Sequence, residues 1–147
     1  MILDVAIYLF VALELANVML MYFKPDFRYG NSMSVFTAWE RAQTDKQQKL
    51  FVDYLVRWVA NCKVIFIALL LMIALFASQS LKFWAVIATI VAMGLYFVTL
   101  HPIIKQLDAQ GDIRPKGYSR TLAINILAFQ AMFAAAALLH LLQLGDL

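Results

Sequence analysis

Four stretches of the chain consist mainly of apolar residues, and each is long enough to cross a membrane as a helix. They cover residues 2–23, 54–77, 83–104 and 118–142. A helix needs roughly 20 residues to span a hydrocarbon core of about 30 Å. The pattern therefore predicts four transmembrane helices that form one domain over residues 1–147, with both termini on the same side of the membrane.

The first connection, between the first two stretches, carries two local signals. A turn is predicted by three adjacent small or polar residues, Gly30, Asn31 and Ser32. A short helix lying in the membrane interface is predicted by apolar residues at helical spacing, Val35, Phe36 and Trp39. The fold class that follows is an all-α integral membrane protein, a four-transmembrane-helix bundle with a short interfacial helix in the first cytoplasmic loop.

Two further signals bear on the ends of the second and third helices. Asp45, followed three positions later by Gln48, has the pattern of a capping box, in which a side-chain oxygen accepts hydrogen bonds from first-turn amides. We therefore expect the second helix to begin at Lys46 and to run without a break into the apolar stretch. His101-Pro102 is expected to end or bend the third helix, because proline lacks a backbone donor and clashes with the preceding turn.

The composition supports this fold class. Hydrophobic residues make up 64% of the chain and charged residues 14%, and the mean hydropathy is +0.79. That leaves too little polar surface to cover a soluble globule of 147 residues. The net charge of +3 is small, so we expect membrane lipids rather than nucleic acid as partners.

The distribution of basic residues predicts the orientation of the chain. Seven lie in or beside the first connection: Lys24, Arg28, Arg41, Lys46, Lys49, Arg57 and Lys63. Four lie in or beside the third: Lys105, Arg114, Lys116 and Arg120. Only Lys82 lies at the second connection. Because basic residues gather on the cytoplasmic side, the first and third connections are predicted to be cytoplasmic and both termini external, and we expect the protein in a bacterial inner membrane.

Glu14 is the most informative single residue, because it lies within the otherwise apolar first stretch. A charged side chain at that depth costs at least roughly 2.5 to 3.5 kcal/mol, so it normally faces protein or water. At 1.5 Å per residue, Glu14 and Lys63 each lie roughly 13 Å from the cytoplasmic ends of their helices. We expect Glu14 to face the bundle interior, with Lys63 or Arg57 as its nearest cation.

Other polar residues are predicted at similar depths, in the cytoplasmic half of the membrane, where they would line a pocket or a path. The candidate ligand-binding or pathway residues are Glu14, Asn17, Arg57, Asn61, Lys63, Tyr96, Thr99, His101 and Asn125. The alternative is that these side chains only cross-link the helices, at roughly 0.6 kcal/mol per hydrogen bond.

The sequence carries no catalytic signature. It contains no glycine-rich phosphate loop, no thiol pair and no run of metal ligands, and Cys62 is its single cysteine. His101 and His140 are predicted near opposite faces of the membrane, so one chain cannot place both on a single haem iron. We therefore expect no metal and no cofactor.

Three functions remain open. The favoured one is a polar intramembrane pocket, open to the cytoplasmic side, that binds or translocates a small polar or amphipathic ligand. Because a four-helix protomer encloses little volume, a homo-oligomer is expected with it. The alternatives are a membrane-embedded enzyme acting on a lipophilic substrate, with Glu14 as acid/base, and a non-catalytic accessory subunit of a larger membrane complex.

Overall fold

The structure is a computed structural model that describes residues 2–27 and 33–145, and within these ranges the chain is helical, with one isolated β-bridge. The predicted turn at Gly30, Asn31 and Ser32 lies outside the described residues. The elements in chain order are α1 (Ile2–Phe23), η1 (Met33–Val35), α2 (Thr37–Ala42), α3 (Lys46–Phe76), α4 (Gln79–Thr99), α5 (His101–Gln110) and α6 (Tyr118–Gly145). Four segments, namely α1, α3, α4 with α5, and α6, are long and apolar enough to cross a membrane.

The first two long helices begin at the residues that the sequence indicates. α1 has the predicted bounds. α3 begins at Lys46, because the Asp45 carboxylate accepts hydrogen bonds from the backbone amides of Gln47 and Gln48 at 2.8 and 2.9 Å. The expectation of one unbroken helix from Lys46 into the apolar stretch is thus confirmed.

The third helical segment is longer than predicted at both ends. It begins at Gln79 rather than at 83, because the Ser78 hydroxyl caps it by accepting from the Leu81 amide at 3.4 Å. α4 ends at Thr99, and α5 resumes at His101 with proline in its first turn, which confirms the predicted interruption. α5 then continues to Gln110 and ends there, since Gly111 takes a left-handed conformation (φ 80°).

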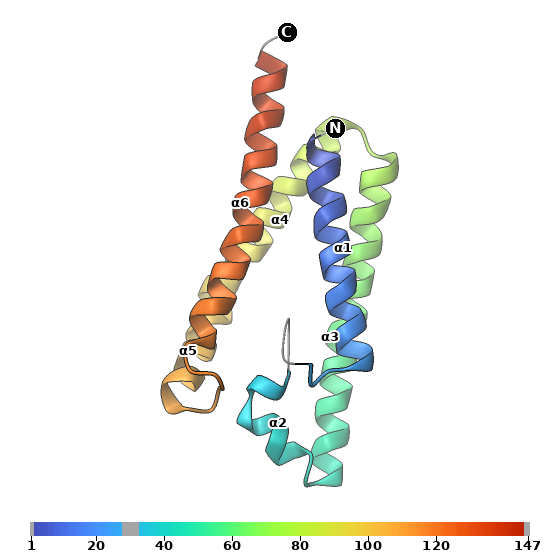
Figure 1. Ribbon diagram of the computed structural model, residues 1–147. Helices are drawn as coiled ribbons and strands as arrows, with labels where there is room; N and C mark the ends of the chain where they lie inside the picture. The colour runs from blue at the N-terminus through green and yellow to red at the C-terminus, as the bar shows by residue number, and fades with distance from the viewer. Residues whose placement is uncertain (1, 28–32, 146–147) are drawn as a thin grey trace.

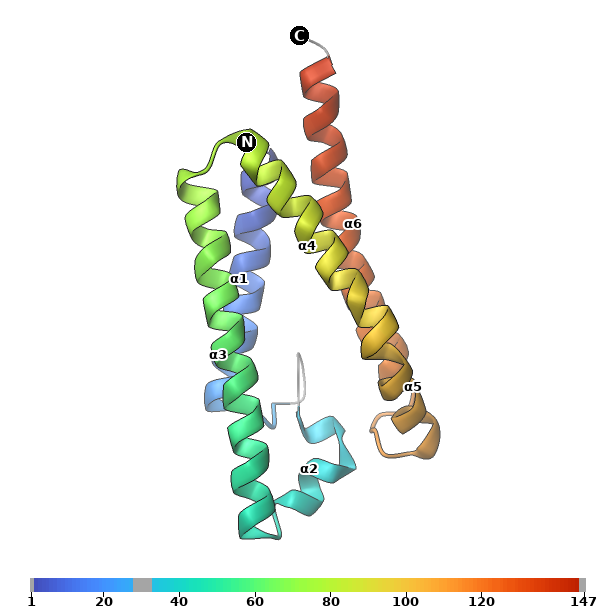
Figure 2. The same ribbon diagram turned by 180° about the vertical axis from the view of Figure 1, so that it is seen from behind.

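The helices are arranged in two pairs. α1 lies alongside α3, and α4 with α5 lies alongside α6 (Figures 1 and 2). The beginning of α1 and the end of α6 lie at the same end of the molecule, which we call the terminal end, and the opposite end is the loop end (Figure 1). The two pairs meet near the terminal end and diverge toward the loop end, as both views show.

Toward the terminal end, all four long helices share one hydrophobic core. Leu3 and Ile7 of α1, Val86 of α4 and Phe133 of α6 are almost fully buried there. α3 contributes Leu70 to the same core. Because every helix pair takes part in this core, it holds the two pairs together.

Toward the loop end, a second and separate cluster of buried side chains lies on one helix pair only. Tyr96 of α4 and Ile104 of α5 belong to it. The other two members are Val35 of η1 and Ile113 of the third connection. The first connection therefore reaches across from the α1–α3 pair and packs against the α4–α6 pair.

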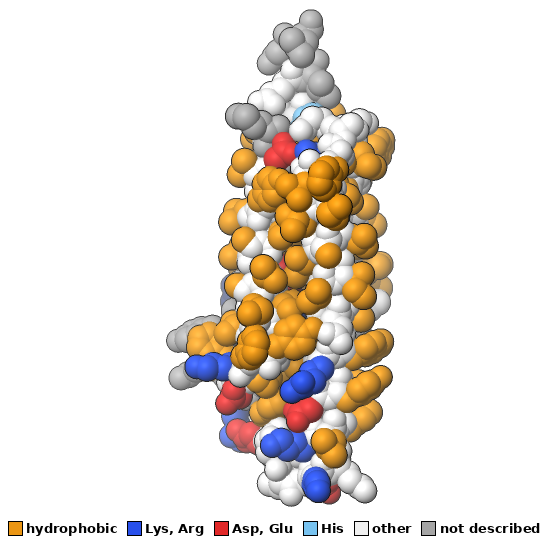
Figure 3. Space-filling view, turned by 90° about the vertical axis from the view of Figure 1, so that its right-hand side faces the viewer, with side chains coloured by type: hydrophobic (Ala, Val, Ile, Leu, Met, Phe, Trp, Pro, Cys, Tyr) orange, Lys and Arg blue, Asp and Glu red, His pale blue; other side chains and the backbone are white. Residues whose placement is uncertain are grey.

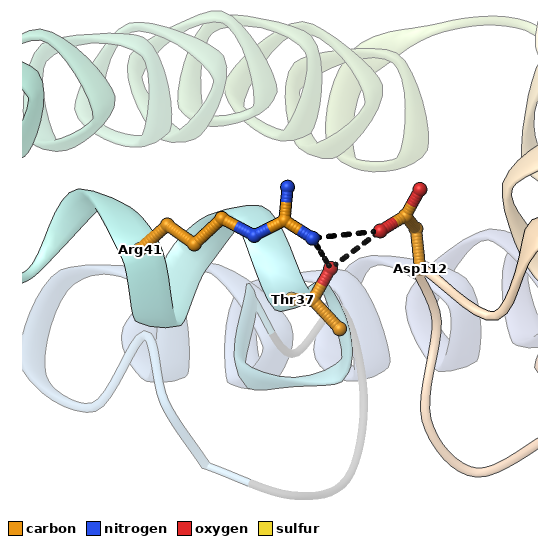
Figure 4. Close-up of polar contacts among 3 residues, drawn as sticks. All are labelled: Thr37, Arg41 and Asp112. Atoms are coloured by element: carbon orange, nitrogen blue, oxygen red, sulfur yellow. Dashed lines mark hydrogen bonds and ion pairs between the residues drawn. The ribbon is translucent and has the colours of Figure 1, made fainter.

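The two connections also bond to each other directly. Phe36 and Ile113 form the antiparallel β-bridge, and the Thr37 amide donates to the Asp112 carbonyl oxygen at 2.9 Å. The Asp112 carboxylate accepts from the Thr37 hydroxyl at 2.8 Å and from the Arg41 guanidinium at 3.1 Å (Figure 4). We call this contact, between residues 35–41 and 112–114, the loop junction. It joins the two helix pairs at the loop end.

The surface of the bundle is apolar in the middle and charged at the loop end. Apolar side chains cover the middle of the face shown in Figure 3, and Lys, Arg, Asp and Glu gather at the loop end of that face. Trp58, Leu69 and Met72 of α3 are among the large apolar side chains that lie exposed. Such an apolar belt is the surface that a bundle presents to lipid.

Candidate functional site

A cavity of about 550 Å³ lies between the two helix pairs, and α1, α3, α4 and α6 all contribute to its wall. Most of the wall is apolar: Phe10, Leu13, Phe66, Met93, Leu122, Ile126, Ala128 and Phe129. The polar part consists of four residues: Glu14, Asn17, Lys63 and Asn125. The site therefore combines an apolar chamber with one polar patch.

The cavity is bounded toward the terminal end by packed aromatic rings. The Phe10 ring lies 6.1 Å from that of Phe66, 5.2 Å from that of Phe129 and 5.1 Å from that of Phe133, measured between centroids. The first two contacts are edge-to-face, an arrangement that aromatic rings prefer. Each of these residues lies nearer the terminal end than the polar patch does, so the rings lie between the polar patch and the shared core.

An ion pair forms the centre of the polar patch. The Lys63 ammonium donates to the Glu14 carboxylate at 2.6 Å, across the α1–α3 contact. The two side chains are 17% exposed for Glu14 and 25% for Lys63, so each keeps some accessible surface. The predicted pairing of Glu14 with a cation is confirmed, and Lys63 rather than Arg57 is that cation.

Two amides complete the polar patch. Asn17 follows Glu14 by three positions and lies on the same face of α1. Asn125 lies on α6, so the patch draws on both helix pairs. The formal charges of Glu14 and Lys63 cancel, and the amides offer both donors and acceptors. The patch is therefore suited to hydrogen bonding rather than to holding a net charge.

The other candidate residues of α3 do not line this cavity. Asn61 accepts a hydrogen bond from the Tyr22 hydroxyl. It precedes Lys63 by two positions, which is about 200° around a helix, so the two side chains cannot point into the same space. Arg57, six positions before Lys63, is exposed. The predicted pocket is corrected on this point, because similar depth did not bring these side chains to one face.

The candidates of α4 and α5 also lie elsewhere. Tyr96 is buried in the second cluster, with its hydroxyl 3.3 Å from His101 Nδ1. The His101 ring lies 5.5 Å from that of Tyr96 and 5.9 Å from that of Phe97, between centroids. The Thr99 hydroxyl donates to the Leu95 carbonyl oxygen of its own helix at 2.7 Å. These side chains stabilise the break between α4 and α5 rather than line the cavity.

A buried ion pair near the terminal end was not predicted from the sequence. The Lys82 ammonium donates to the Asp4 carboxylate at 2.5 Å, and the Gln79 amide donates to the other Asp4 oxygen at 3.1 Å. The Lys82 side chain is only 8% exposed. The signal that could have found it is the position of each residue within the first turns of a helix that starts at the terminal end.

Asp108 is a second polar residue that the sequence did not single out. It is buried and accepts hydrogen bonds from the Gly117 amide at 2.9 Å, the Ser119 amide at 3.1 Å and the Ser119 hydroxyl at 2.6 Å. Gly117 is the last residue of the third connection and Ser119 lies in the first turn of α6, so Asp108 fixes the path of that connection between α5 and α6. Its environment is closed and its role is structural.

The chemistry available at the cavity follows from its four polar side chains. Among the residues that the structure describes, no group of three or more His, Cys, Asp or Glu could hold a metal ion. The site has one carboxylate, one ammonium and two amides, which together can orient a polar group by hydrogen bonds. Comparison of the chain with protein-family models, with curated proteins and with solved structures finds no match.

Proposed function

We propose that this is an integral membrane protein that binds a small polar or amphipathic ligand in the cavity between its helix pairs. The four long apolar segments and the exposed apolar belt support insertion into a membrane. The gathering of basic residues in and beside the first and third connections supports an orientation with the loop end in the cytoplasm and both termini outside. In that orientation α2 lies at the cytoplasmic interface.

The observation that carries this proposal is the Glu14–Lys63 pair in the wall of a cavity of ligand size. Ligand sites commonly enclose about 300 to 1,000 Å³, with mostly apolar walls and a few convergent polar groups. The cavity has about 550 Å³ and this distribution of residues. An ion pair that only held α1 to α3 would not require open volume beside it. Partial exposure of both charges toward a cavity favours a role in binding.

The buried core between the helix pairs favours binding over translocation. Leu3, Ile7 and Val86 fill the space between the pairs together with the Phe133 ring. A ligand in the cavity would therefore reach it from the cytoplasmic half, where the pairs diverge (Figure 2). Release to the outer side would require this core to open.

The proposal is tested by identifying what the protein carries when it is purified in a mild detergent. Organic extracts of the wild type and of the double variant Glu14→Gln, Lys63→Met are compared by mass spectrometry. We expect a small molecule in near-stoichiometric amount from the wild type and its loss from the double variant, with helix content unchanged by circular dichroism. Arg57→Met is the matched control, because it removes an exposed cation of the same helix, and it should retain the molecule.

Three results would contradict binding as the function. Identical extracts from all three proteins would separate the polar patch from any ligand. A larger membrane protein that accompanies every variant, with no small molecule, would favour the accessory-subunit alternative. Chemical conversion of the extracted molecule by the wild type and not by Glu14→Gln would favour the enzyme alternative, with Glu14 as acid/base.

A further inference from the structure

A second cavity, of about 360 Å³, lies between α1 and α6 nearer the terminal end. Its wall is entirely apolar in residue type, with Val5 and Leu9 on α1 facing Met132, Ala135 and Leu139 on α6. α1 and α6 are the two helices on the near side of the molecule in Figure 1. The cavity is therefore a hydrophobic space within the apolar belt, not part of the polar patch.

The two cavities lie one beyond the other along the same side of α1 and α6. On α1, Leu9 lines the second cavity and Leu13, four positions later, lines the first. On α6, Met132 lines the second and Ala128, four positions earlier, lines the first. Residues four apart lie on the same helix face, so both cavities follow the same side of the contact between α1 and α6. We call this path the α1–α6 groove.

From this alignment we propose that the ligand is a lipid with one long apolar tail and an uncharged head, a deepening that rests on the proposed function. The head, which carries hydroxyl or carbonyl oxygens, lies at the Glu14–Lys63 pair. The tail follows the α1–α6 groove toward the terminal end. Hydroxyl and carbonyl heads both accept hydrogen bonds from the site, and a hydroxyl head also donates one.

The charges of the polar patch favour a ligand with an uncharged head. Glu14 and Lys63 already neutralise each other at 2.6 Å, and the remaining polar lining is amide. A head with a net charge would be left uncompensated at this depth. An uncharged head instead finds further Lys63 N–H donors, the second Glu14 oxygen as acceptor and the Asn125 amide, which supplies both.

The length of the groove favours a ligand with one long tail. From Asn125 to Leu139 the wall of α6 rises by about 21 Å at 1.5 Å per residue, well over half of a hydrocarbon core of about 30 Å. The walls along this path are apolar beyond the patch, so they offer nothing to a second polar group. One extended tail therefore fits the groove, with its end near the outer boundary of the membrane.

Photo-crosslinking tests both the position and the direction of the lipid. Two long-chain alcohols are used with the full chain in lipid nanodiscs, one carrying a diazirine beside the hydroxyl and the other a diazirine near the chain end. We expect the first probe to label peptides around Asn17 and Lys63, and the second to label peptides around Val5 and Leu139. The unlabelled alcohol should compete, whereas the same chain with a quaternary ammonium or sulfonate head should not.

A matched pair of variants tests the groove itself. Ala135→Trp fills the groove, while Ala134→Trp places the same side chain on the neighbouring exposed position of α6, which does not line it. Labelling by the chain-end probe should fall about tenfold in Ala135→Trp and stay unchanged in Ala134→Trp. Ala135→Leu, a smaller filling, serves if the tryptophan variant does not fold.

The outcomes separate this inference from the proposed function. If the hydroxyl-end probe labels the polar patch but the chain-end probe does not label the groove, the ligand site stands and the lipid tail is rejected. If the charged analogues compete as well as the alcohol, the uncharged head is rejected. If neither probe labels the region of Lys63, both the inference and the proposed function fail.

Discussion

Replacing Glu14 with glutamine should destabilise the protein, and adding Lys63→Met should restore most of the loss. Removing one partner of a fully buried pair costs about 3–5 kcal/mol, because the other charge is stranded. Here the side chains are 17% and 25% exposed beside a cavity, so solvation offsets part of that cost. We expect each single substitution to lower the free energy of unfolding by about 2 kcal/mol.

The assay is a double-mutant cycle on the free energy of unfolding. Unfolding in mixed micelles with increasing denaturing detergent is followed by circular dichroism for the wild type, both single variants and the double variant. Because the two single losses sum to about 4 kcal/mol and the double variant should lose less than about 1 kcal/mol, the coupling between the two positions should be about 3 kcal/mol or more. That value lies above the roughly 0.6 kcal/mol typical of a hydrogen bond between membrane helices, so it identifies a true ion pair.

Arg57 provides the control for this cycle, because it is an exposed cation on the same helix as Lys63. Glu14→Gln combined with Arg57→Met should show additive effects, since no contact joins the two side chains. The reasoning is refuted if Glu14→Gln and Lys63→Met are also additive, for then the 2.6 Å contact contributes nothing to stability.

Three other predictions concern orientation and the connections. A reporter active only in the cytoplasm, fused to the C-terminus, should be inactive; strong activity would reverse the proposed topology. Asp108→Asn should lower the free energy of unfolding by about 1–3 kcal/mol, because its amide nitrogen would face donors that now bind a carboxylate, and a neutral result would contradict the structural role of that residue. Asp112→Ala should cost about 1 kcal/mol, whereas Arg41→Ala, with a side chain 73% exposed, should cost at most about 0.5 kcal/mol; equal losses would show that the guanidinium contributes more than its exposure implies.

Local signals in the sequence predicted most helix ends correctly. Asp45 marked the start of α3, and His101-Pro102 marked the break in the third segment. The start of α4 was missed because hydropathy alone excludes the polar turn after Ser78, although that serine caps the helix. Hydropathy finds the part of a helix that lies in lipid, while caps determine where the helix begins.

The candidate site was predicted in part. The sequence gives the depth of a residue along its helix, but not the direction in which its side chain points. Depth correctly paired Glu14 with Lys63, since both positions lie at one level of neighbouring helices. It also placed Asn61 and Tyr96 in the pocket, and these side chains face other surroundings. The 200° between Asn61 and Lys63 was available from helix geometry alone. Direction on different helices, as for Tyr96, requires knowledge of how the helices pack.

The sequence alone could not predict the contacts between the first and third connections. Nothing in the composition of residues 35–41 indicates that they bond to residues 112–114, more than seventy positions away. The contact depends on how far the two helix pairs diverge at the loop end. Only the assembled bundle brings these segments together.

The loop junction joins the two helix pairs at the end where they diverge. The shared core joins the same pairs near the terminal end, and the cavity lies between these two points of attachment. The separation of the helix pairs at the level of Glu14 therefore depends on both points of attachment. Arg41 and Asp112 are 73% and 37% exposed, so in the proposed orientation ions and soluble molecules of the cytoplasm reach the loop junction. In the proposed orientation, contacts made in water thus help to set the width of a cavity that lies within the membrane.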